Sequence, residues 1–393
     1  MHKFNFLGNE PVSASRFFQK KVESAMTAEG KAPLRSLAAA LYPISLAYGA
    51  AQKLRAFAYR HRVMPARQLP CKVICVGNIT VGGTGKTPMT MCVAQLVKQF
   101  GYRVAILSRG YRGRAESRGG IVSDGQSLFM GPERAGDEPY LMARSLKEIP
   151  VITGKNRYAS GLLALEKFQP DVIVLDDGFQ HLRLQRDIDL VLLDHALPFG
   201  NTHLLPRGIL REPIASLARS TACVLTRCPT GTGKAPASGL DMIKKYAPHS
   251  PLFTSSHVPY LYLNEPAKPF SVDGTATPCL QPEIDRLAID AVFGFSGIAR
   301  NAEFQNTVKD LGFNAAGFME FSDHHRYTVH DLSFIQSKAE RAGARCLITT
   351  EKDLVRLSPQ NPFPLPLIVV GVKISFGNHR EQFISFLKQQ LAR

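Results

Sequence analysis

The loop at residues 77–88, GNITVGGTGKTP, constrains the fold more than any other part of this chain. It follows an apolar run, CKVICV, that is typical of a buried strand. A strand, a glycine loop with Gly-Lys-Thr and a helix are the context of a P-loop, whose backbone and helix N-terminus bind phosphate. We therefore expect a nucleoside triphosphate in this loop, because an ordinary glycine turn would not explain the Lys and Thr. The helix is predicted from apolar residues at helical spacing: Met89, Val93, Leu96, Val97 and Phe100.

The residues of the loop have separate expected roles. Lys86 would neutralise the β- and γ-phosphates, and the Thr87 hydroxyl would bind Mg²⁺. The usual pattern has a glycine five residues before Gly85, where this chain has Thr80. A second Gly-Lys, in GTGKA at 231–235, lacks a hydroxyl after the lysine and is interpreted as part of a linker. The predicted nucleotide-binding residues are Thr80, Val81, Gly82, Gly83, Thr84, Gly85, Lys86 and Thr87.

Two adjacent carboxylates, Asp176 and Asp177, end a second apolar run, DVIVL. Such a pair is unfavourable unless a cation compensates it, and P-loop proteins use an acidic group at a strand end to organise Mg²⁺. The alternative is a capped strand end. Gln180 and His181 follow in DDGFQH, at the edge where parallel strands face a ligand. We predict a magnesium site at Thr87, Asp176 and Asp177, with the carboxylate that touches the metal left open.

The rest of the chain alternates strand-like and helix-like segments, which predicts an α/β fold: a P-loop NTPase-type, mostly parallel sheet covered by helices, with a second, smaller α/β domain. Strands are expected at 71–79, 102–110, 151–153, 171–179, 188–194 and 222–227, and later at 291–299 and 365–376. The expected parts are a polar extension (1–33), an interfacial helix (34–62), a P-loop kinase domain (63–225) and a domain that closes over the site (226–393), whose final helix is free to pack back.

The helix expected at 34–62 has an apolar stretch at 37–51, shorter than the 18 or more apolar residues of a spanning helix. An excess of 48 Lys and Arg over 32 Asp and Glu gives a net charge of +16, which implies an anionic partner or only a host with basic proteins. The helix therefore either lies on an anionic membrane surface or packs on the core. One face is expected to carry Leu34, Leu37, Leu41, Ile44 and Tyr48, flanked by Lys31, Arg35, Lys53, Arg55, Arg60, Arg62 and Arg67.

The seven cysteines are scattered without zinc spacing and are interpreted as reduced thiols of a cytosolic protein. A series of motifs is more specific: NITVGGTGKTP, SRGYRG, GDEP, DDGFQH, LPRGILREP, SDHHRY and TTEKD, in that order. Over about residues 34–393 the chain resembles the tetraacyldisaccharide 4′-kinases. The resemblance implies ATP- and Mg²⁺-dependent phosphorylation of the 4′-hydroxyl of tetraacyldisaccharide 1-phosphate, in lipid A biosynthesis. It also implies a peripheral, monomeric enzyme at the cytoplasmic face of the bacterial inner membrane, docked through its N-terminal helix.

The resemblance assigns roles at matching positions. Asp137, in GDEP, matches the proposed catalytic base, and His324, in SDHH, matches its partner. Without the resemblance, Asp137 would be interpreted as a helix N-cap and His324 as a loop histidine. These two residues meet only if the second domain folds over the first, which would exclude water. Lys86 and Asp177 complete the catalytic set, and Arg211 and Glu212 match a hinge segment between the domains.

A basic loop with Arg109, Arg112, Arg114 and Arg118 needs an anion, expected to be the substrate's 1-phosphate or lipid headgroups. Nucleic acid is not expected, because only Tyr111 offers an aromatic ring there. The rival function is a membrane-recruited P-loop ATPase that acts as a switch or positioning protein. Val81 stands where those ATPases often carry a signature lysine, which counts against this rival.

Overall fold

Residues 36–229, 237–264, 291–357, 363 and 365–393 are described by the computed structural model of the chain. The extension expected at 1–33 and the second Gly-Lys at 231–235 lie outside them. The six cysteines within the described residues are free thiols, as expected.

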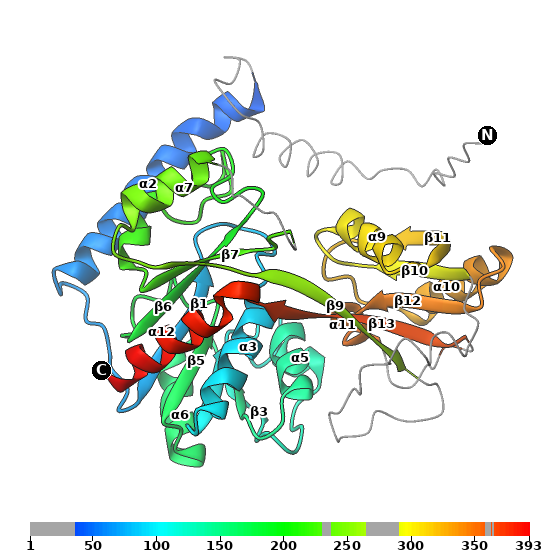
Figure 1. The fold of residues 1–393 in the computed structure, drawn as a ribbon, viewed down its shortest axis with the longest axis horizontal. Helices are drawn as coiled ribbons and strands as arrows, with labels where there is room; N and C mark the ends of the chain where they lie inside the picture. Colours follow the sequence, from blue (N-terminus) through cyan, green and yellow to red (C-terminus); the bar gives the residue numbers. More distant parts are fainter. Residues whose placement is uncertain (1–35, 230–236, 265–290, 358–362, 364) are drawn as a thin grey trace.

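The larger of two sheets has eight strands in the order β3-β4-β2-β5-β1-β6-β7-β8 (Figure 1). Its neighbours are parallel except β3 and β4. The expected mostly parallel sheet is therefore confirmed. The strands are β1 (Lys72–Asn78), β2 (Val104–Ser108), β3 (Gly120–Ser123), β4 (Val151–Thr153), β5 (Val172–Asp176), β6 (Ile188–Asp194), β7 (Ala222–Thr226) and β8 (Leu252–Thr254).

Helices cover both faces of this sheet because its strands are apolar on both sides. In β1, Ile74 and Val76 belong to the core under α3, whereas Val73 and Cys75 belong to the opposite core. This alternation is the two-residue period of a strand. The helices are α3 (Lys86–Gln99), α4 (Pro132–Ala135), α5 (Asp137–Ser145), α6 (Arg157–Phe168) and α7 (Ala237–Tyr246), with a 3-10 turn η1 (Ile214–Arg219).

The smaller sheet has five strands in the order β11-β10-β12-β13-β9, with only β9 antiparallel to its neighbour. The expected second, smaller α/β unit is therefore confirmed. Its strands are β9 (Ser256–Asn264), β10 (Ala291–Ser296), β11 (Asn314–Glu320), β12 (Cys346–Thr350) and β13 (Leu367–Ser375), and its helices are α9 (Asn301–Asp310), α10 (Val329–Arg341) and α11 (Glu351–Leu354).

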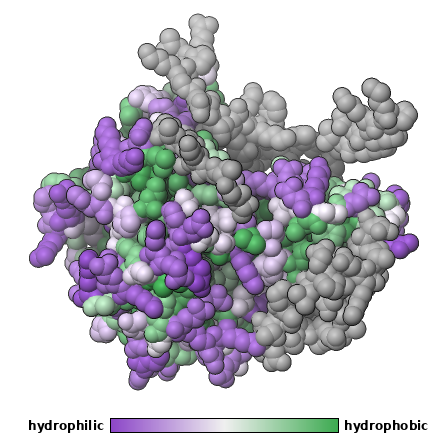
Figure 2. Space-filling model, in the orientation of Figure 1, coloured by the Kyte–Doolittle hydropathy of each residue, from purple (hydrophilic) through white to green (hydrophobic). Residues whose placement is uncertain are grey.

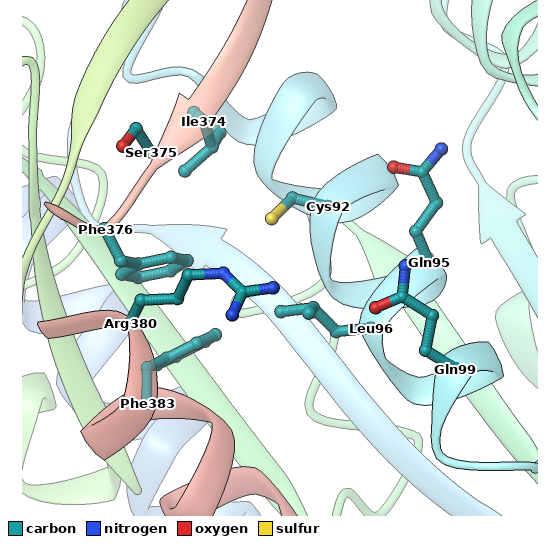
Figure 3. Close-up of a pocket in the computed structure, with 9 residues that line it drawn as sticks. All are labelled: Cys92, Gln95, Leu96, Gln99, Ile374, Ser375, Phe376, Arg380 and Phe383. Carbon is teal, nitrogen blue, oxygen red and sulfur yellow. The ribbon is translucent and has the colours of Figure 1, made fainter.

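The chain passes between the sheets through β9 and β13, which pair from Ser256↔Ser375 to Leu367↔Asn264 (Figure 1). After β13, a 3-10 turn η2 (Gly377–His379) leads to α12 (Arg380–Ala392), which packs back on the larger sheet. Phe383 and Leu387 of α12 share a core with Met89 of α3. A cavity of about 230 Å³ lies between α3 and α12, lined by Cys92, Gln95 and Arg380 among others (Figure 3).

The boundary expected between residues 225 and 226 does not match the sheets. β8 pairs with β7 in the larger sheet, with Cys223 opposite Leu252, and the partly buried Leu240 and Met242 of α7 pack on the core of that sheet. The first unit therefore runs past the expected boundary and receives α12 from the end of the chain. The sequence did not predict β8, because this strand has only three residues. The expected boundary was therefore placed too early in the chain.

The N-terminal helix α2 (Leu37–Arg60) packs on the larger unit through small residues, Ala38, Ser45 and Gly49. The Ser45 hydroxyl donates to the Leu204 carbonyl (2.7 Å), and the Tyr48 hydroxyl donates to the Arg211 carbonyl (2.8 Å). The prediction of the apolar face is therefore wrong in part. Small residues make the contact with the larger unit, and Ile44 is exposed.

Large apolar side chains of α2 are exposed, and hydrophilic and hydrophobic residues lie side by side over the upper left of the molecule, where α2 and α7 lie in Figure 1 (Figure 2). The exposed apolar side chains of α2 are Tyr42, Ile44, Leu46, Leu54 and Phe57. No helix within the described residues has the length and apolar character needed to cross a membrane. Of the basic residues expected beside the helix, Arg55 donates to the Gln180 carbonyl (2.8 Å), and the Arg67 guanidinium lies over the Tyr158 ring.

Candidate active site

The glycine loop joins β1 to α3. Gly82 and Gly85 have φ of 111° and 80°, the left-handed region that favours glycine. Asn78 Nδ2 donates to Thr84 Oγ1 (3.0 Å), and Thr226 Oγ1 donates to the Thr84 carbonyl (3.0 Å). Two strands thus hold the loop beneath the first turn of α3, whose N–H groups lack intrahelical acceptors and suit an anion.

Thr80 explains how the loop departs from the usual pattern. It is buried, it forms an isolated bridge with Leu210, and its φ is not in the left-handed region. The next residue, Val81, donates its N–H to the Ile209 carbonyl (2.7 Å). The backbone at this position is therefore extended and paired, so a glycine is not required.

Lys86, Asp177 and Arg211 form a charged group at the start of α3. Lys86 Nζ lies 3.9 Å from Asp177 Oδ1, and Arg211 Nη1 donates to both carboxylate oxygens of Asp177 (3.0 and 2.9 Å). Burial alone would raise the pKa of Asp177, but Lys86 and Arg211 lower it below its usual value. Burial lowers the pKa of Lys86, although Asp177 opposes this change. Two cations are thus held where a phosphate would need them.

Asp176 is fully buried at the end of β5, opposite Val76 of β1. Thr90 Oγ1 donates to Oδ1 (3.2 Å) and Ser108 Oγ donates to Oδ2 (3.1 Å). Burial, with Glu138 and Asp177 nearby, raises the pKa of Asp176 to about 7. The ionised form of Asp176 is therefore disfavoured, chiefly by burial, and a divalent cation would stabilise it.

Asp137 begins α5, and its partners come from the second sheet. His324 Nδ1 lies 3.0 Å from Asp137 Oδ2, and Arg356 Nε donates to the same oxygen (2.7 Å). Burial would raise the pKa of Asp137, but the hydrogen bond from His324 and the charge of Arg356 lower it below its usual value. The structure thus brings the two residues of the expected pair into contact.

The neighbouring residue, Glu138, makes a second contact between the two sheets. Lys352 Nζ of α11 donates to Glu138 Oε1 (3.2 Å). Lys352 lowers the pKa of Glu138 against the effect of burial, and Lys86 also lowers it. Since Glu138 is within electrostatic reach of Lys86, the N-terminus of α5 lies beside the glycine loop.

The second sheet also approaches the loop at its other side. Arg300 Nη2 donates to Asp194 Oδ2 (2.9 Å), and Arg227 Nη1 lies 3.2 Å from Glu303 of α9. Arg227 Nη2 would lie 3.8 Å from a Cβ built on Gly83. On β9, the imidazole of His257 touches Gly85, since its Nε2 would lie 2.5 Å from a Cβ there.

The segment that carries Arg211 and Glu212 lies against the larger sheet, not between the sheets. Leu210 bridges to Thr80, Arg211 contacts Asp177, and Glu212 is buried and accepts from Arg219 Nη2 (2.8 Å). The hinge position is therefore wrong for these residues, because β9 and β13 make the connection.

Gln180 and His181 follow the acidic pair. Gln180 Nε2 donates to the Asn78 carbonyl (2.8 Å), which ties this turn to the start of the glycine loop. His181 Nε2 is buried and has no hydrogen-bond partner among the described residues. Burial, followed by the charges of Arg157 and Arg186, lowers the pKa of His181 to about 4. The imidazole is thus neutral at physiological pH.

The basic loop lies beside the Asp137–His324 pair. Arg109 Nε donates to Glu116 Oε1 (2.6 Å), and the guanidinium groups of Arg109 and Arg112 lie 5.8 and 5.4 Å from the Tyr111 ring centre. The Tyr111 ring is in turn 6.4 Å from the His324 ring. Further along the loop, Arg114 pairs with Glu133 (3.5 Å).

Sequence reasoning missed Glu138, Lys352 and Arg356. Glu138 stands inside GDEP and Lys352 inside TTEKD, so both were within recognised motifs without an assigned role. Arg356 follows the second motif by three residues, and nothing in its local pattern marks it. Its burial and its contact with Asp137, 219 positions away, distinguish it from a surface arginine, and both appear only in the structure.

The chain is similar to known proteins over most of its length. A family model described as tetraacyldisaccharide-1-P 4′-kinase matches residues 37–392. The tetraacyldisaccharide 4′-kinase of Desulfatibacillum aliphaticivorans is 38% identical over 374 residues, which cover 95% of this chain and 98% of that protein. That of Syntrophus aciditrophicus strain SB is 41% identical over 345 residues, 84% of this chain and 87% of that protein.

Among solved structures, the crystal structure of LpxK from Aquifex aeolicus in complex with ATP has a TM-score of 0.69 and 32% sequence identity. The match covers 90% of this chain and 99% of that chain. The rival function as an ATPase switch has no such support. This chain belongs to the tetraacyldisaccharide-1-P 4′-kinase family, whose activity is ATP-dependent phosphorylation of the 4′-hydroxyl of the lipid A precursor.

Proposed function

We propose that Asp137 is the base that accepts the proton of the 4′-hydroxyl while the P-loop holds ATP for phosphoryl transfer. The observation that carries this proposal is the contact of the Asp137 carboxylate with His324 and Arg356. The next residue, Glu138, has its pKa lowered in part by the charge of Lys86. A low pKa keeps Asp137 ionised, so the carboxylate is ready to accept a proton.

The O–H bond of the acceptor breaks and its proton passes to Asp137, while the sugar oxygen forms a bond to the γ-phosphorus of ATP. The bond from that phosphorus to the bridging oxygen breaks, and ADP leaves with the electron pair. Lys86 and the loop N–H groups stabilise the charge on the phosphates. Contacts of the second sheet on both sides of the loop, at Glu138 and Asp194, help to exclude water.

Mg²⁺ fits the residues at the end of β5. Asp176 supplies a buried carboxylate whose pKa is raised by burial and by neighbouring carboxylates, so a cation would favour its ionised form, and Thr87 supplies a buried hydroxyl. The described part of the chain holds no group of three or more His, Cys, Asp or Glu side chains suited to a metal. Mg²⁺ needs none, since one or two carboxylates with phosphate oxygens and water suffice. When bound, the ion would neutralise phosphate charge, and Asp177 is the second candidate ligand.

The basic loop supports recognition of an anionic substrate. Arg109 and Arg112 lie around Tyr111, beside His324, so an anionic group of the lipid disaccharide or of a neighbouring lipid would meet two guanidinium groups. We assign this role to Arg109 and Arg112, because both lie against Tyr111, which is next to His324.

The outer face of α2 supports peripheral docking on the cytoplasmic leaflet of the inner membrane. Exposed Leu54 and Phe57 stand beside exposed basic side chains, a pattern of helices that lie on anionic bilayers. The double variant Leu54→Glu/Phe57→Glu should move the protein off anionic liposomes in flotation, and Leu162→Glu, an exposed leucine on α6, serves as the control. Unchanged flotation of the double variant would remove the docking role.

The whole site is built from one chain, since Asp137 and His324 meet within it. This arrangement supports an active monomer. Light scattering coupled to size exclusion in detergent would check the mass of the active species.

The central test uses ATP labelled at the γ-phosphate and detergent-dispersed tetraacyldisaccharide 1-phosphate. We expect label in the lipid only when Mg²⁺ is present. Label released solely as free phosphate would favour the ATPase function and contradict this proposal. Deuterium exchange with and without ATP would show whether the contact at Asp137 changes during binding.

A further inference from the structure

Arg356 is a buried arginine at the boundary between the two sheets. Its side chain is only 2% exposed, and it is held from within the second sheet: Nη1 donates to the Gly297 carbonyl (2.7 Å) and lies 3.4 Å from Asp353 Oδ1. Asp353 is itself fully buried and accepts from the Tyr327 hydroxyl (3.0 Å) and from the Gly297 N–H (2.9 Å). The guanidinium is therefore fixed before it meets the other sheet.

The same carbonyl also positions the histidine. The His324 N–H donates to the Gly297 carbonyl (3.1 Å), and His324 has a φ of 62°, in the left-handed region. His324 and Arg356 thus share one backbone anchor. A change at Arg356 would disturb the histidine through this carbonyl as well as directly.

The contacts of Asp137 distinguish its two oxygens. Among the described residues, both side-chain contacts fall on Oδ2, from Arg356 Nε (2.7 Å) and His324 Nδ1 (3.0 Å). No side-chain contact within the described residues falls on Oδ1, and the Asp137 side chain is 25% exposed. A carboxylate oxygen keeps lone pairs free to accept a proton, so Oδ1 is the oxygen left for an incoming hydroxyl.

The protonation of His324 Nδ1 also bears on the role of Arg356. His324 Nδ1 lies 3.0 Å from the carboxylate and 3.2 Å from Arg356 Nη2. One ring nitrogen cannot donate to a carboxylate and accept from a guanidinium at the same time. With Asp137 ionised, Nδ1 carries the proton and donates it to Oδ2, while Nε of Arg356 donates to the same oxygen.

We propose that Arg356 is a positioning residue that keeps Asp137 ionised and presents its Oδ1 to the acceptor hydroxyl, an inference that rests on the base role proposed above. Arginine suits this task because its planar fork donates to the carboxylate through Nε and to the Gly297 carbonyl through Nη1, a fixed geometry that a lysine does not supply. The other charged groups nearby are Glu138 with its partner Lys352, Lys86 beyond them, Asp353 behind the guanidinium, and Asp323, which lies 3.9 Å from His324 Nε2.

The test is the pH profile of kcat at saturating Mg·ATP and detergent-dispersed tetraacyldisaccharide 1-phosphate. Arg356→Gln should lower kcat about 10- to 100-fold, because a base displaced by about 1 Å loses that much. Its acid limb should move to higher pH, because the lost cation lets the pKa of Asp137 rise. Arg356→Lys keeps the charge, so its limb should stay near that of the wild type while kcat still falls. Mg·ATP affinity, measured by calorimetry, should not change.

The matched control is Arg341→Gln, an exposed arginine at the end of α10. A merely structural role would lower the activity of Arg356→Gln equally at every pH, and this outcome would overturn the inference. A kcat of Arg356→Gln equal to that of Arg341→Gln would also overturn the inference. Should Arg356→Gln not fold, Arg356→Lys decides the matter, since wild-type kcat in that variant also excludes the role. If Asp137→Ala itself keeps its turnover, the base role fails instead.

Discussion

The nucleotide half of the site and its base half are assembled in different ways. Lys86 begins α3, after the loop that follows β1, and Asp177 directly follows β5, and these two strands are neighbours in one sheet. Asp137 instead meets His324 and Arg356 from the other sheet, 187 and 219 positions along the chain. A single sheet can thus form the first half, whereas the second exists only when the two units are in contact.

This difference separates binding from turnover. Changes in the nucleotide half should weaken ATP binding and phosphoryl transfer together. Changes in the base half should lower turnover and leave ATP affinity intact, because none of its groups belongs to the glycine loop.

The largest expected effect is that of Lys86→Ala. Loss of a preorganised cation on the phosphates should lower kcat about 1000-fold, and calorimetry should show weaker Mg·ATP binding. Lys98→Ala, on the same helix but paired with Glu148, is the control. Equal kinetics for the two variants would contradict the assignment of the loop.

Asp137→Ala should lower kcat by about two orders of magnitude, the upper part of the range for loss of a general base. Its Mg·ATP affinity should equal that of the wild type, which is the sharpest test of the comparison. Glu133→Ala removes an exposed acid from the adjacent α4 and should be silent. Joint loss of affinity and turnover in Asp137→Ala would mean that the halves are not separable.

The pH dependence of stability should come in part from His257. Burial, followed by the charge of Arg227, lowers the pKa of His257 to about 4. Because the unfolded chain binds this proton from about pH 6.5, stability should fall as pH drops from 6.5 to 4. His257→Gln should reduce that loss by roughly 2 kcal/mol in urea unfolding at pH 7 and pH 4.5. His330→Gln, on the surface of α10, should leave the slope unchanged.

The smallest effect is expected at the start of α10. Thr328 and Asp331 form a capping box, in which each side chain accepts from the backbone of the other. Thr328→Ala should lower the free energy of unfolding by about 1 kcal/mol, with ATP affinity unaffected. Ser333→Ala, within the same helix, is the comparison variant. A change in nucleotide binding would show that the second sheet supports the loop directly.

The elements near the glycine loop could be predicted because each carries its own signal. The ranges predicted from apolar runs, glycine and helical spacing match the observed positions of β1, β4, β6 and α3. The antiparallel β9 was missed, because its sequence contains Pro259 and its partner β13 comes some hundred residues later. As an edge strand, β9 tolerates the proline. β3, β11 and α10 were also missed, although the capping box at Thr328 was a readable start signal.

The residues of the candidate site likewise divide into those with a local sequence signal and those without one. Lys86, Thr87, Asp176 and Asp177 follow from local pattern and strand ends. Asp137 and His324 were predicted only through the family resemblance. In sequence alone, a catalytic aspartate at the start of a helix looks the same as an N-cap, and a catalytic histidine looks the same as an ordinary loop histidine. Arg356 was not reached, since its role depends on packing between distant segments.

The two strands that join the sheets limit how the halves can move. A single connecting strand would let one unit swivel freely on the other. β9 and β13 are paired along nine residues each, so two hydrogen-bonded strands join the units. We expect this double connection to restrict the directions in which the units can separate, and so to favour the return of histidine, guanidinium and carboxylate to the same mutual placement.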